Sequence, residues 1–386
     1  MSFQEYLSTL IPLIVFLALW GLIVLAYYAL GLKRVGFDLK PYLLLFWRIK
    51  SLERILVRVS LRRRVSWLTV FDIGVAMGVG MMLYTVYFLV RNLLNLALRS
   101  GVFIEVAPPV PGLLYPWEHL PHVILALSIT IFIHELAHGI ALKMDGIPIK
   151  SMGVFLFTIL PGGFVEPDEG VLVKSKAAIK LRVFAAGSFL NMVSFFIVLL
   201  IVLTTFQPAG ALIVEVIEQS PAEAAGIEKW SVIYAINNIP IRGVDDLVRV
   251  LGSFKPRDTV MVNFIRPNGV YDSVTVILKE GLSGRAFLGV RISDFQRFII
   301  GDLPYPIMFQ LQFFVFWLIV ILQSVALFNM LPLPVFDGGS FVRTIIDSAF
   351  KYRKGWARIT YLAISNFCVI LLLTNILATM WVWGWK

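Results

Sequence analysis

The stretch IFIHELAHGIAL, residues 131–142, decides how the rest of the chain is interpreted. His134, Glu135 and His138 form the pattern His-Glu-x-x-His, which is typical of zinc hydrolases. Residues four apart share one face of a helix, so both histidines can bind one ion and Glu135 can reach a water on it. The surrounding residues are Ile, Phe, Leu and Ala, as in a membrane span, where ionisable groups indicate a functional site. The alternative is a polar cluster that packs helices together.

The composition agrees with a membrane location. The 386 residues are 59% hydrophobic and the mean hydropathy is +0.84, whereas soluble domains are about 45–50% apolar. The single cysteine, Cys368, excludes an internal disulfide and a cysteine-based zinc cluster. Six stretches have the length and apolar character of membrane-spanning helices: residues 7–32, 66–97, 121–142, 182–206, 306–331 and 358–384.

Lys and Arg are concentrated in three connecting segments, residues 33–66, 143–182 and 343–358, and the opposite short loops carry almost none. The positive-inside rule then predicts six spans with both termini outside the cytoplasm. These loops explain the net charge of +10, so we expect the lipid bilayer and no nucleic acid as a partner. Residues 33–65 also alternate apolar and basic side chains, which is typical of a segment on the membrane surface.

Residues 207–298 have the pattern of a soluble α+β domain. ALIVEVIEQ alternates as a strand does, SPAEAAGI is typical of a short helix, and GVDDLVRVLGSF is amphipathic. Pro267-Asn268-Gly269 is a hairpin signal between two strands. This order resembles a PDZ domain, a class that binds peptides by strand addition. The topology places the domain outside the cytoplasm, where it would contact or filter substrates, or act as a spacer.

A catalytic zinc ion takes three protein ligands and keeps one position open, so the two histidines need a partner. His119 and His122 are excluded, because His122 lies twelve residues before His134, about 18 Å along a helix axis. Asp337 ends a span that runs in the same direction as the span with His134, and both groups reach a similar depth. The distribution of Lys and Arg alone fixes these directions, so Asp337 is the expected third ligand.

The segment FNMLPLPVFDGGS, residues 328–340, contains features expected near a site. Pro332 and Pro334 break the helix at membrane depth, where irregular backbone must be buried in protein or line a wet cavity. Asn329 offers an amide that can bind a substrate carbonyl or an oxyanion.

His-Glu-x-x-His in a span, a PDZ-like domain, and then Asn-x-x-Pro-x-Pro-x-x-Asp-Gly resemble the site-2 protease family of intramembrane zinc metalloproteases. LPGGFVEPDEG, residues 160–170, resembles the Pro-Gly-Gly/Ala-Phe-Val segment of that family, and KLRVFAAGSFLNM, residues 180–192, resembles its Gly-x-x-x-Asn motif. Ser188 stands where many members have proline. The resemblance covers about residues 120–340, and the matching residues are His134, Glu135, His138, Gly162, Gly163, Gly187, Asn191, Asn329, Pro332, Pro334, Asp337 and Gly338.

The resemblance implies a zinc endopeptidase, one Zn²⁺ per chain, that cuts transmembrane segments of other proteins. It implies His134, His138 and Asp337 as ligands and Glu135 as general base. Residues 149–167 would form a re-entrant hairpin that offers an edge strand to substrate, with packing between spans as the alternative. Gly162 and Gly163 belong to this hairpin and are expected to bind substrate. Asn191 either orients substrate or joins helices, and the ligand set would also suit cobalt or iron.

We therefore expect a polytopic α-helical membrane protein with about six transmembrane helices, a re-entrant hairpin and an inserted α+β PDZ-like domain. The site would open toward the cytoplasm of a prokaryotic plasma membrane, and the oligomeric state stays open. The competing functions are a silent scaffold that holds membrane proteins through the PDZ-like domain, and a metal transporter. The expected segments are 1–120 with two spans, 121–206 and 299–345 as the two parts of the catalytic core, 207–298 as the PDZ-like domain, and 346–386 with the last span.

Overall fold

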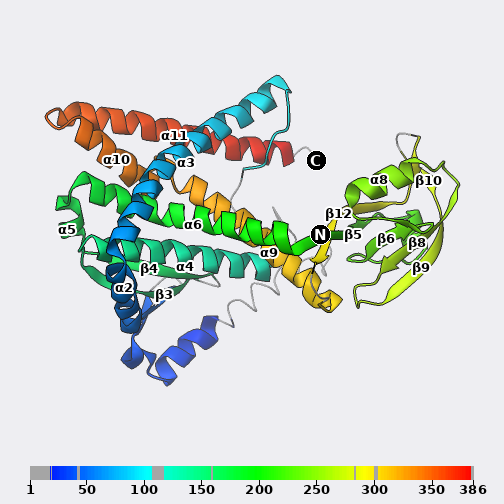
Figure 1. Ribbon diagram of the computed structural model, residues 1–386, viewed down its shortest axis with the longest axis horizontal. Helices are drawn as coiled ribbons and strands as arrows, with labels where there is room; N and C mark the ends of the chain where they lie inside the picture. The colour runs from blue at the N-terminus through cyan, green and yellow to red at the C-terminus, as the bar shows by residue number, and fades with distance from the viewer. Residues whose placement is uncertain are drawn as a thin grey trace. The chain divides into compact units, whose positions relative to one another are not determined.

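The computed structural model describes residues 18, 20–40, 44–106, 117–157, 160–281, 284–299 and 303–383. The chain divides into two units, Met1–Phe195 with Trp317–Lys386, and Phe196–Phe316, which are considered separately (Figure 1). About half of the first expected span, residues 7–32, lies outside the described residues. Its described part includes a short apolar helix, Trp20–Ala29.

Five helices among the described residues are long and apolar enough to cross a membrane, and they correspond to the other five expected spans. Their residues are apolar on nearly all sides, which a helix in lipid requires. The predicted class, a mostly helical membrane protein with an inserted β-rich region, is confirmed. The five helices are α3 (Arg64–Leu98), α4 (Leu120–Met144), α6 (Ala177–Thr205), α9 (Tyr305–Phe328) and α11 (Lys354–Trp383).

A four-stranded antiparallel sheet accompanies these helices in the order β1-β2-β3-β4. The expected hairpin at residues 149–167 is formed by β3 (Ile149–Phe157) and β4 (Leu160–Pro167). Strands β1 (Phe37–Lys40) and β2 (Leu44–Arg48) extend it, with Trp47 opposite Val154. We had expected only a basic surface segment there, and local alternation did not reveal this long-range pairing.

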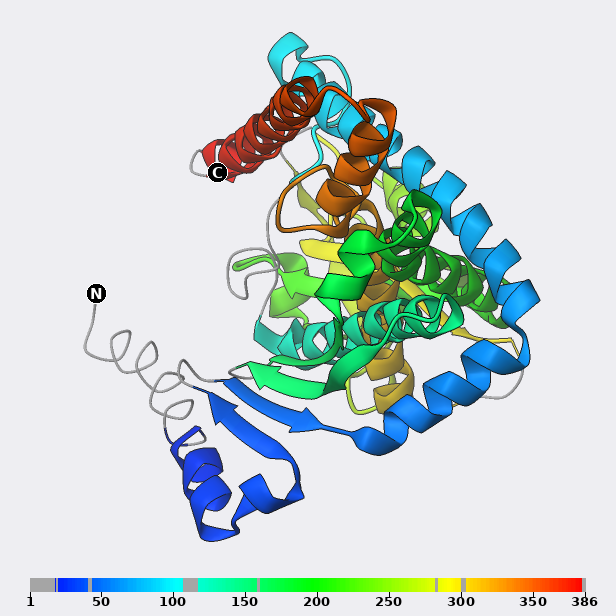
Figure 2. The same ribbon diagram turned by 90° about the vertical axis from the view of Figure 1, so that its left-hand side faces the viewer.

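The helical unit also contains shorter helices. Helix α2 (Lys50–Arg62) packs against α4 (Figure 2). At this contact Leu56 lies over Gly139. Asp168 caps α5 (Glu169–Lys174) by accepting hydrogen bonds from the Gly170 and Val171 amides. Helix α10 (Asp337–Ala349) follows the irregular turn after α9. Span α9 ends at Phe328, earlier than the expected residue 331, because the proline-containing turn begins there.

The second unit contains a sheet in the order β12-β5-β6-β8-β9, with β7 paired to β6. Its strands are β5 (Phe206–Val216), β6 (Val232–Ile236), β7 (Ile239–Pro240), β8 (Thr259–Ile265), β9 (Tyr271–Ile277) and β12 (Val290–Phe298), and β10 (Lys279–Glu280) pairs with β11 (Ala286–Phe287) separately. Helices α7 (Pro221–Ala224) and α8 (Val244–Gly252) lie between strands. Every element expected from the sequence of this region is present.

Local sequence explains these elements. The Ser220 side chain accepts a hydrogen bond from the Glu223 amide, and Glu223 accepts one from the Gln219 amide, which is close to a capping box at the start of α7. In the β8–β9 turn, Asn268 accepts from the Val270 amide, and Gly269 adopts the left-handed conformation that the turn requires. Buried aliphatic residues of β5, β6 and β8 form the core of the unit.

Candidate metal centre

Helix α4 and the start of α10 bring three ligand-type side chains together. His134 Nε2 lies 3.0 Å from Asp337 Oδ2, and His138 Nε2 lies 3.1 Å from the same oxygen. The two Nε2 atoms are 3.1 Å apart. The two histidines and the aspartate predicted as ligands therefore converge on one point.

The donor set fits a zinc ion. Two imidazole nitrogens and one carboxylate oxygen are ligands that zinc commonly uses in catalytic sites, and the three ligand atoms lie within 4.8 Å of one another. Around tetrahedral zinc, bonds of about 2.0–2.1 Å place ligand atoms about 3.3–3.4 Å apart. The observed spacings of 3.0–3.1 Å are close to this value, so small side-chain movements would admit the ion.

The turn between α9 and α10 holds Asp337 in place. The Gly338 amide donates to the Asn329 carbonyl over 2.9 Å, which folds the turn back on the end of α9. A Cβ atom at Gly338 would overlap the carbonyl groups of Met330 and Leu331, so this close approach requires glycine. Asn329 Nδ2 donates to Asp337 Oδ2 over 2.6 Å and lies 3.2 Å from His134 Nε2. Asn329 thus lies against the ligand atoms.

Backbone and side-chain groups of α6 contact the other ring nitrogens. His138 Nδ1 lies 2.8 Å from the Val183 carbonyl, which can only accept, so Nδ1 carries the proton and Nε2 is left free to bind a metal. His134 Nδ1 lies 3.2 Å from Asn191 Nδ2. Gly187, one turn before Asn191, lies directly against the His134 ring. The Gly-x-x-x-Asn motif therefore meets the metal centre.

Glu135 lies between the candidate metal ligands and the sheet. Its Oε2 accepts a hydrogen bond of 3.0 Å from the Val165 amide of β4. This amide points away from β3, and by strand alternation the backbone groups of Gly163 point the same way. In the described part of the chain β4 is the last strand of this sheet. The Glu135 carboxylate therefore lies at the outer edge of β4.

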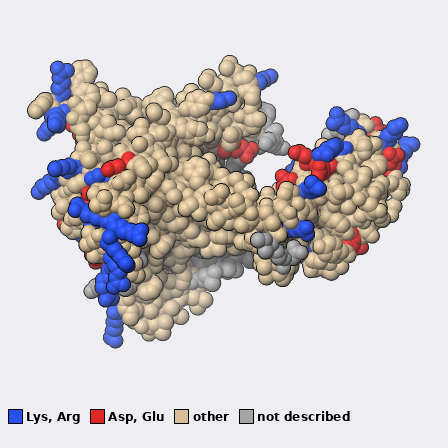
Figure 3. All heavy atoms as spheres, viewed as in Figure 1, with Lys and Arg blue, Asp and Glu red and all other residues tan. Residues whose placement is uncertain are grey.

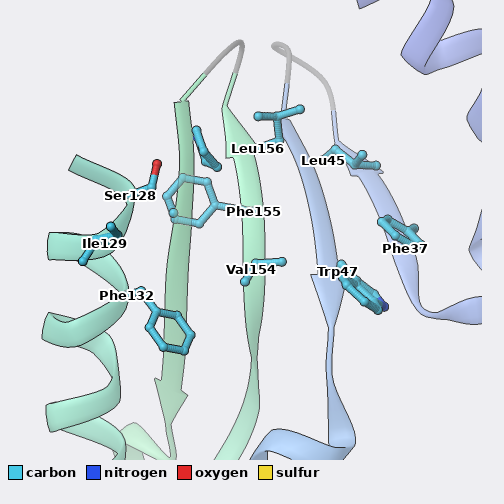
Figure 4. Close-up of a pocket in the computed structure, with 11 residues that line it drawn as sticks. Phe37, Leu45, Trp47, Ser128, Ile129, Phe132, Val154, Phe155 and Leu156 are labelled. Atoms are coloured by element: carbon cyan, nitrogen blue, oxygen red, sulfur yellow. The ribbon is translucent and has the colours of Figure 1, made fainter. Parts of the chain in front are cut away.

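The two glycines predicted to bind substrate face different neighbours. A Cβ atom at Gly163 would lie 3.4 Å from Glu135 Cβ, an ordinary contact, whereas a Cβ atom at Gly162 would lie 2.6 Å from the Phe155 ring. Gly162 also lines an apolar pocket of about 420 Å³ beside α4. Figure 4 shows Phe132 of α4 and Val154 of β3 in this pocket. Side chains of β1 and β2, among them Phe37 and Trp47, extend its wall.

The sequence did not reveal the main-chain groups that contact His138 and Glu135. The Val183 carbonyl and the Val165 amide carry no side-chain signal, so only the fold reveals them. Gly187 appeared as part of a motif, without a reason for its position. His119 and His122 lie outside the converging group, as expected, and His119 accepts a hydrogen bond of 2.8 Å from Trp317.

The chain is similar to known proteins over the region that contains these residues. The model of peptidase family M50 matches residues 122–374, which include all three ligand-type residues. An uncharacterized protein of Methanocaldococcus jannaschii is 29% identical over 259 residues, or 65% of each chain. An Arabidopsis thaliana homolog of the membrane-bound transcription factor site-2 protease is 31% identical over 32% of this chain and 24% of its own length.

The chain thus spans less than two thirds of the length of these relatives. A solved PDZ domain of an SdrC-like protein from Listeria monocytogenes is 18% identical, with a TM-score of 0.21, over 22% of this chain and 87% of that domain. The family match covers more than half of the chain and contains the converging histidines and aspartate. The chain belongs to peptidase family M50, the family of the site-2 proteases.

Proposed function

We propose that this protein is a zinc endopeptidase that cleaves transmembrane segments of other membrane proteins. The observation that carries the proposal is the convergence of His134 and His138, on the apolar helix α4, and Asp337, at the start of α10, with Glu135 directly beside them. Peptide-bond hydrolysis needs an electrophile, a water and a proton carrier, and this group of side chains can provide or hold all three.

The residues have separate roles in this proposal. His134, His138 and Asp337 hold the zinc ion, which when bound supplies Lewis acidity and lowers the pKa of water to about 7. Glu135 takes the proton of the attacking water and returns it to the leaving amine. Asn329, whose Nδ2 lies within 3.2 Å of both ligand-type partners, is placed to donate to the oxygen that gains charge.

The outer edge of β4 would hold the substrate. A transmembrane helix must unwind before cleavage, and each unpaired backbone group in hydrocarbon costs several kcal/mol. Pairing with Gly163 would satisfy these groups next to Glu135, whose contact with the Val165 amide is 3.0 Å. The apolar pocket beside Gly162 would then take an apolar substrate side chain (Figure 4).

Charge supports the proposed orientation. Within the helical unit, Figure 3 shows Lys and Arg gathered at the end where α2, α5 and α10 lie. The C-terminal half of α4, with the metal centre, leads toward Lys143 and this end. By the positive-inside rule the site would open toward the cytoplasm of a prokaryotic plasma membrane. The same rule assigns residues 207–298 to the extracytoplasmic segments, where the PDZ-like domain would filter substrates.

The test uses full-length protein in lipid vesicles with a panel of single-span substrates, with zinc or with a chelator. Wild type should cleave with zinc, and Glu135→Gln should bind zinc without cleaving. Cleavage by Glu135→Gln at the wild-type rate would contradict the role of Glu135. A zinc-loaded wild-type protein that leaves the whole panel intact would contradict the peptidase and favour the scaffold.

A further inference from the structure

Helix α6 passes the metal centre with two residues one turn apart, and both contact the same imidazole. Gly187 leaves space for the His134 ring, since a Cβ atom there would lie 2.5 Å from Nδ1 and closer still to Cε1 and Nε2. Asn191 Nδ2 lies 3.2 Å from His134 Nδ1. The Asn191 side chain is fully buried, and its Oδ1 has no hydrogen-bond partner among the described residues.

The orientation of this amide depends on which nitrogen of the His134 ring carries the proton, because Asn191 contacts Nδ1. In the arrangement described, Nδ2 donates to His134 Nδ1, so the ring proton must be on Nε2, where it can donate to Asp337. A histidine protonated on Nε2 cannot bind a metal through that atom.

Metal binding through Nε2 requires the opposite arrangement. Nδ1 must then carry the proton and needs an acceptor, as histidine ligands generally do. Asn191 is the Nδ1 partner of His134 among the described residues, and turning its amide by half a turn brings Oδ1 to this position. His138 has a fixed acceptor for the same purpose, the Val183 carbonyl at 2.8 Å.

We propose that Asn191 is a positioning residue for the metal centre: its Oδ1 accepts the Nδ1 proton of His134 and so selects the tautomer that binds metal through Nε2. Gly187 serves the same purpose by admitting the ring. Because its side chain is fully buried against a ligand, Asn191 acts through His134 and not on substrate. This inference rests on the proposed zinc site and adds the group that prepares one of its ligands.

The experiment measures zinc affinity of the full-length protein by competition with a chromophoric chelator. Asn191→Leu keeps the approximate shape and removes the acceptor, and zinc affinity should fall by about 10- to 100-fold. Asn191→Asp keeps an acceptor oxygen and should restore most of the affinity. Ser188→Ala is the matched control, because Ser188 is on the same helix, fully buried, and its Oγ has no partner among the described residues; its zinc affinity should equal that of wild type.

The outcomes separate this inference from the proposed function. A wild-type protein that binds no zinc would overturn the function itself. Unchanged zinc affinity in a folded Asn191→Leu protein, with a raised KM, would overturn the positioning role and return Asn191 to substrate binding. Asn191→Ala provides a second test if the leucine variant does not fold, with the same expected loss of affinity.

Discussion

Gly187→Ala is a steric test of the metal centre that leaves every polar group in place. The added Cβ would lie 2.5 Å from His134 Nδ1, about 1 Å inside the normal contact distance of ~3.5 Å. The imidazole would have to move away from α6, and with it the Nε2 atom that lies 3.0 Å from Asp337. The change therefore separates the ring from its ligand position.

Two opposing energies determine the result. Alanine in place of glycine stabilises a helix interior by about 1 kcal/mol. An extra methyl group in a packed interior costs about 1–3 kcal/mol, and this cost falls on the His134 ring. If the ring bears the cost when it binds zinc, affinity decreases by about 5- to 150-fold, since 1.4 kcal/mol is a factor of ten.

Zinc competition with a chelator measures the affinity, and thermal unfolding with and without zinc measures stability, because a tightly bound ion stabilises the folded state. Gly80→Ala in α3 is the control, since a Cβ atom there would meet nothing within 4 Å. The control should bind zinc as wild type does and unfold at an equal or higher temperature. If Gly187→Ala behaves like the control in both measurements, the His134 ring does not lie against α6 as described.

Three further predictions concern other parts of the chain. Asp337→Ala should abolish zinc binding or weaken it severely, and metal analysis that finds near-stoichiometric zinc in this variant would show that the third ligand is wrong. In the second unit the Arg266 guanidinium, through its hydrogen bond to Asp272, lowers the pKa of that carboxyl. The resulting stabilisation is present above the pKa of Asp272 in the unfolded state and is lost as pH falls through its pKa in the folded state. Hydrogen exchange should therefore show β8 and β9 opening more in acid for wild type, and the same increase in an Asp272→Asn variant would refute this. Gln207 of β5 pairs with Arg297 of β12, so a short turn can replace residues 208–295. This deletion should change substrate choice more than the rate of peptide-bond cleavage. Loss of all cleavage in a folded, zinc-bound deletion variant would contradict this prediction.

The sequence predicted which three side chains converge, because two independent constraints met at Asp337. Helical periodicity placed His134 and His138 on one face, and the distribution of Lys and Arg placed Asp337 at their depth. The distances of 3.0 and 3.1 Å to its Oδ2 agree with both. One constraint concerns position along a helix and the other concerns depth in the membrane. Both follow from the order of residues in a single sequence.

The surroundings of the ligands could not be predicted in the same way. Strand β2 pairs with β3, about a hundred residues later in the chain, and β1 pairs with β2. Neither alternation nor charge in residues 33–48 indicates β3 as a partner. The acceptor for His138 is a main-chain carbonyl, that of Val183, whose position depends on how α6 lies against α4. Contacts of this kind arise from packing between segments, so they became visible only in the structure.

The apolar surroundings of IFIHELAHGIAL follow from how its polar atoms are paired. His134 meets Asn191 and Asp337, His138 meets Val183 and Asp337, and Glu135 meets the Val165 amide. The partners come from α6, from β4 and from the start of α10, so α4 needs no polar residues of its own around the motif. The same arrangement ties the proposed base to the strand at the edge of the sheet. In the proposed function, a substrate strand that pairs with β4 would therefore arrive beside Glu135 as its helix unwinds, with its exposed peptide bonds next to the candidate metal centre.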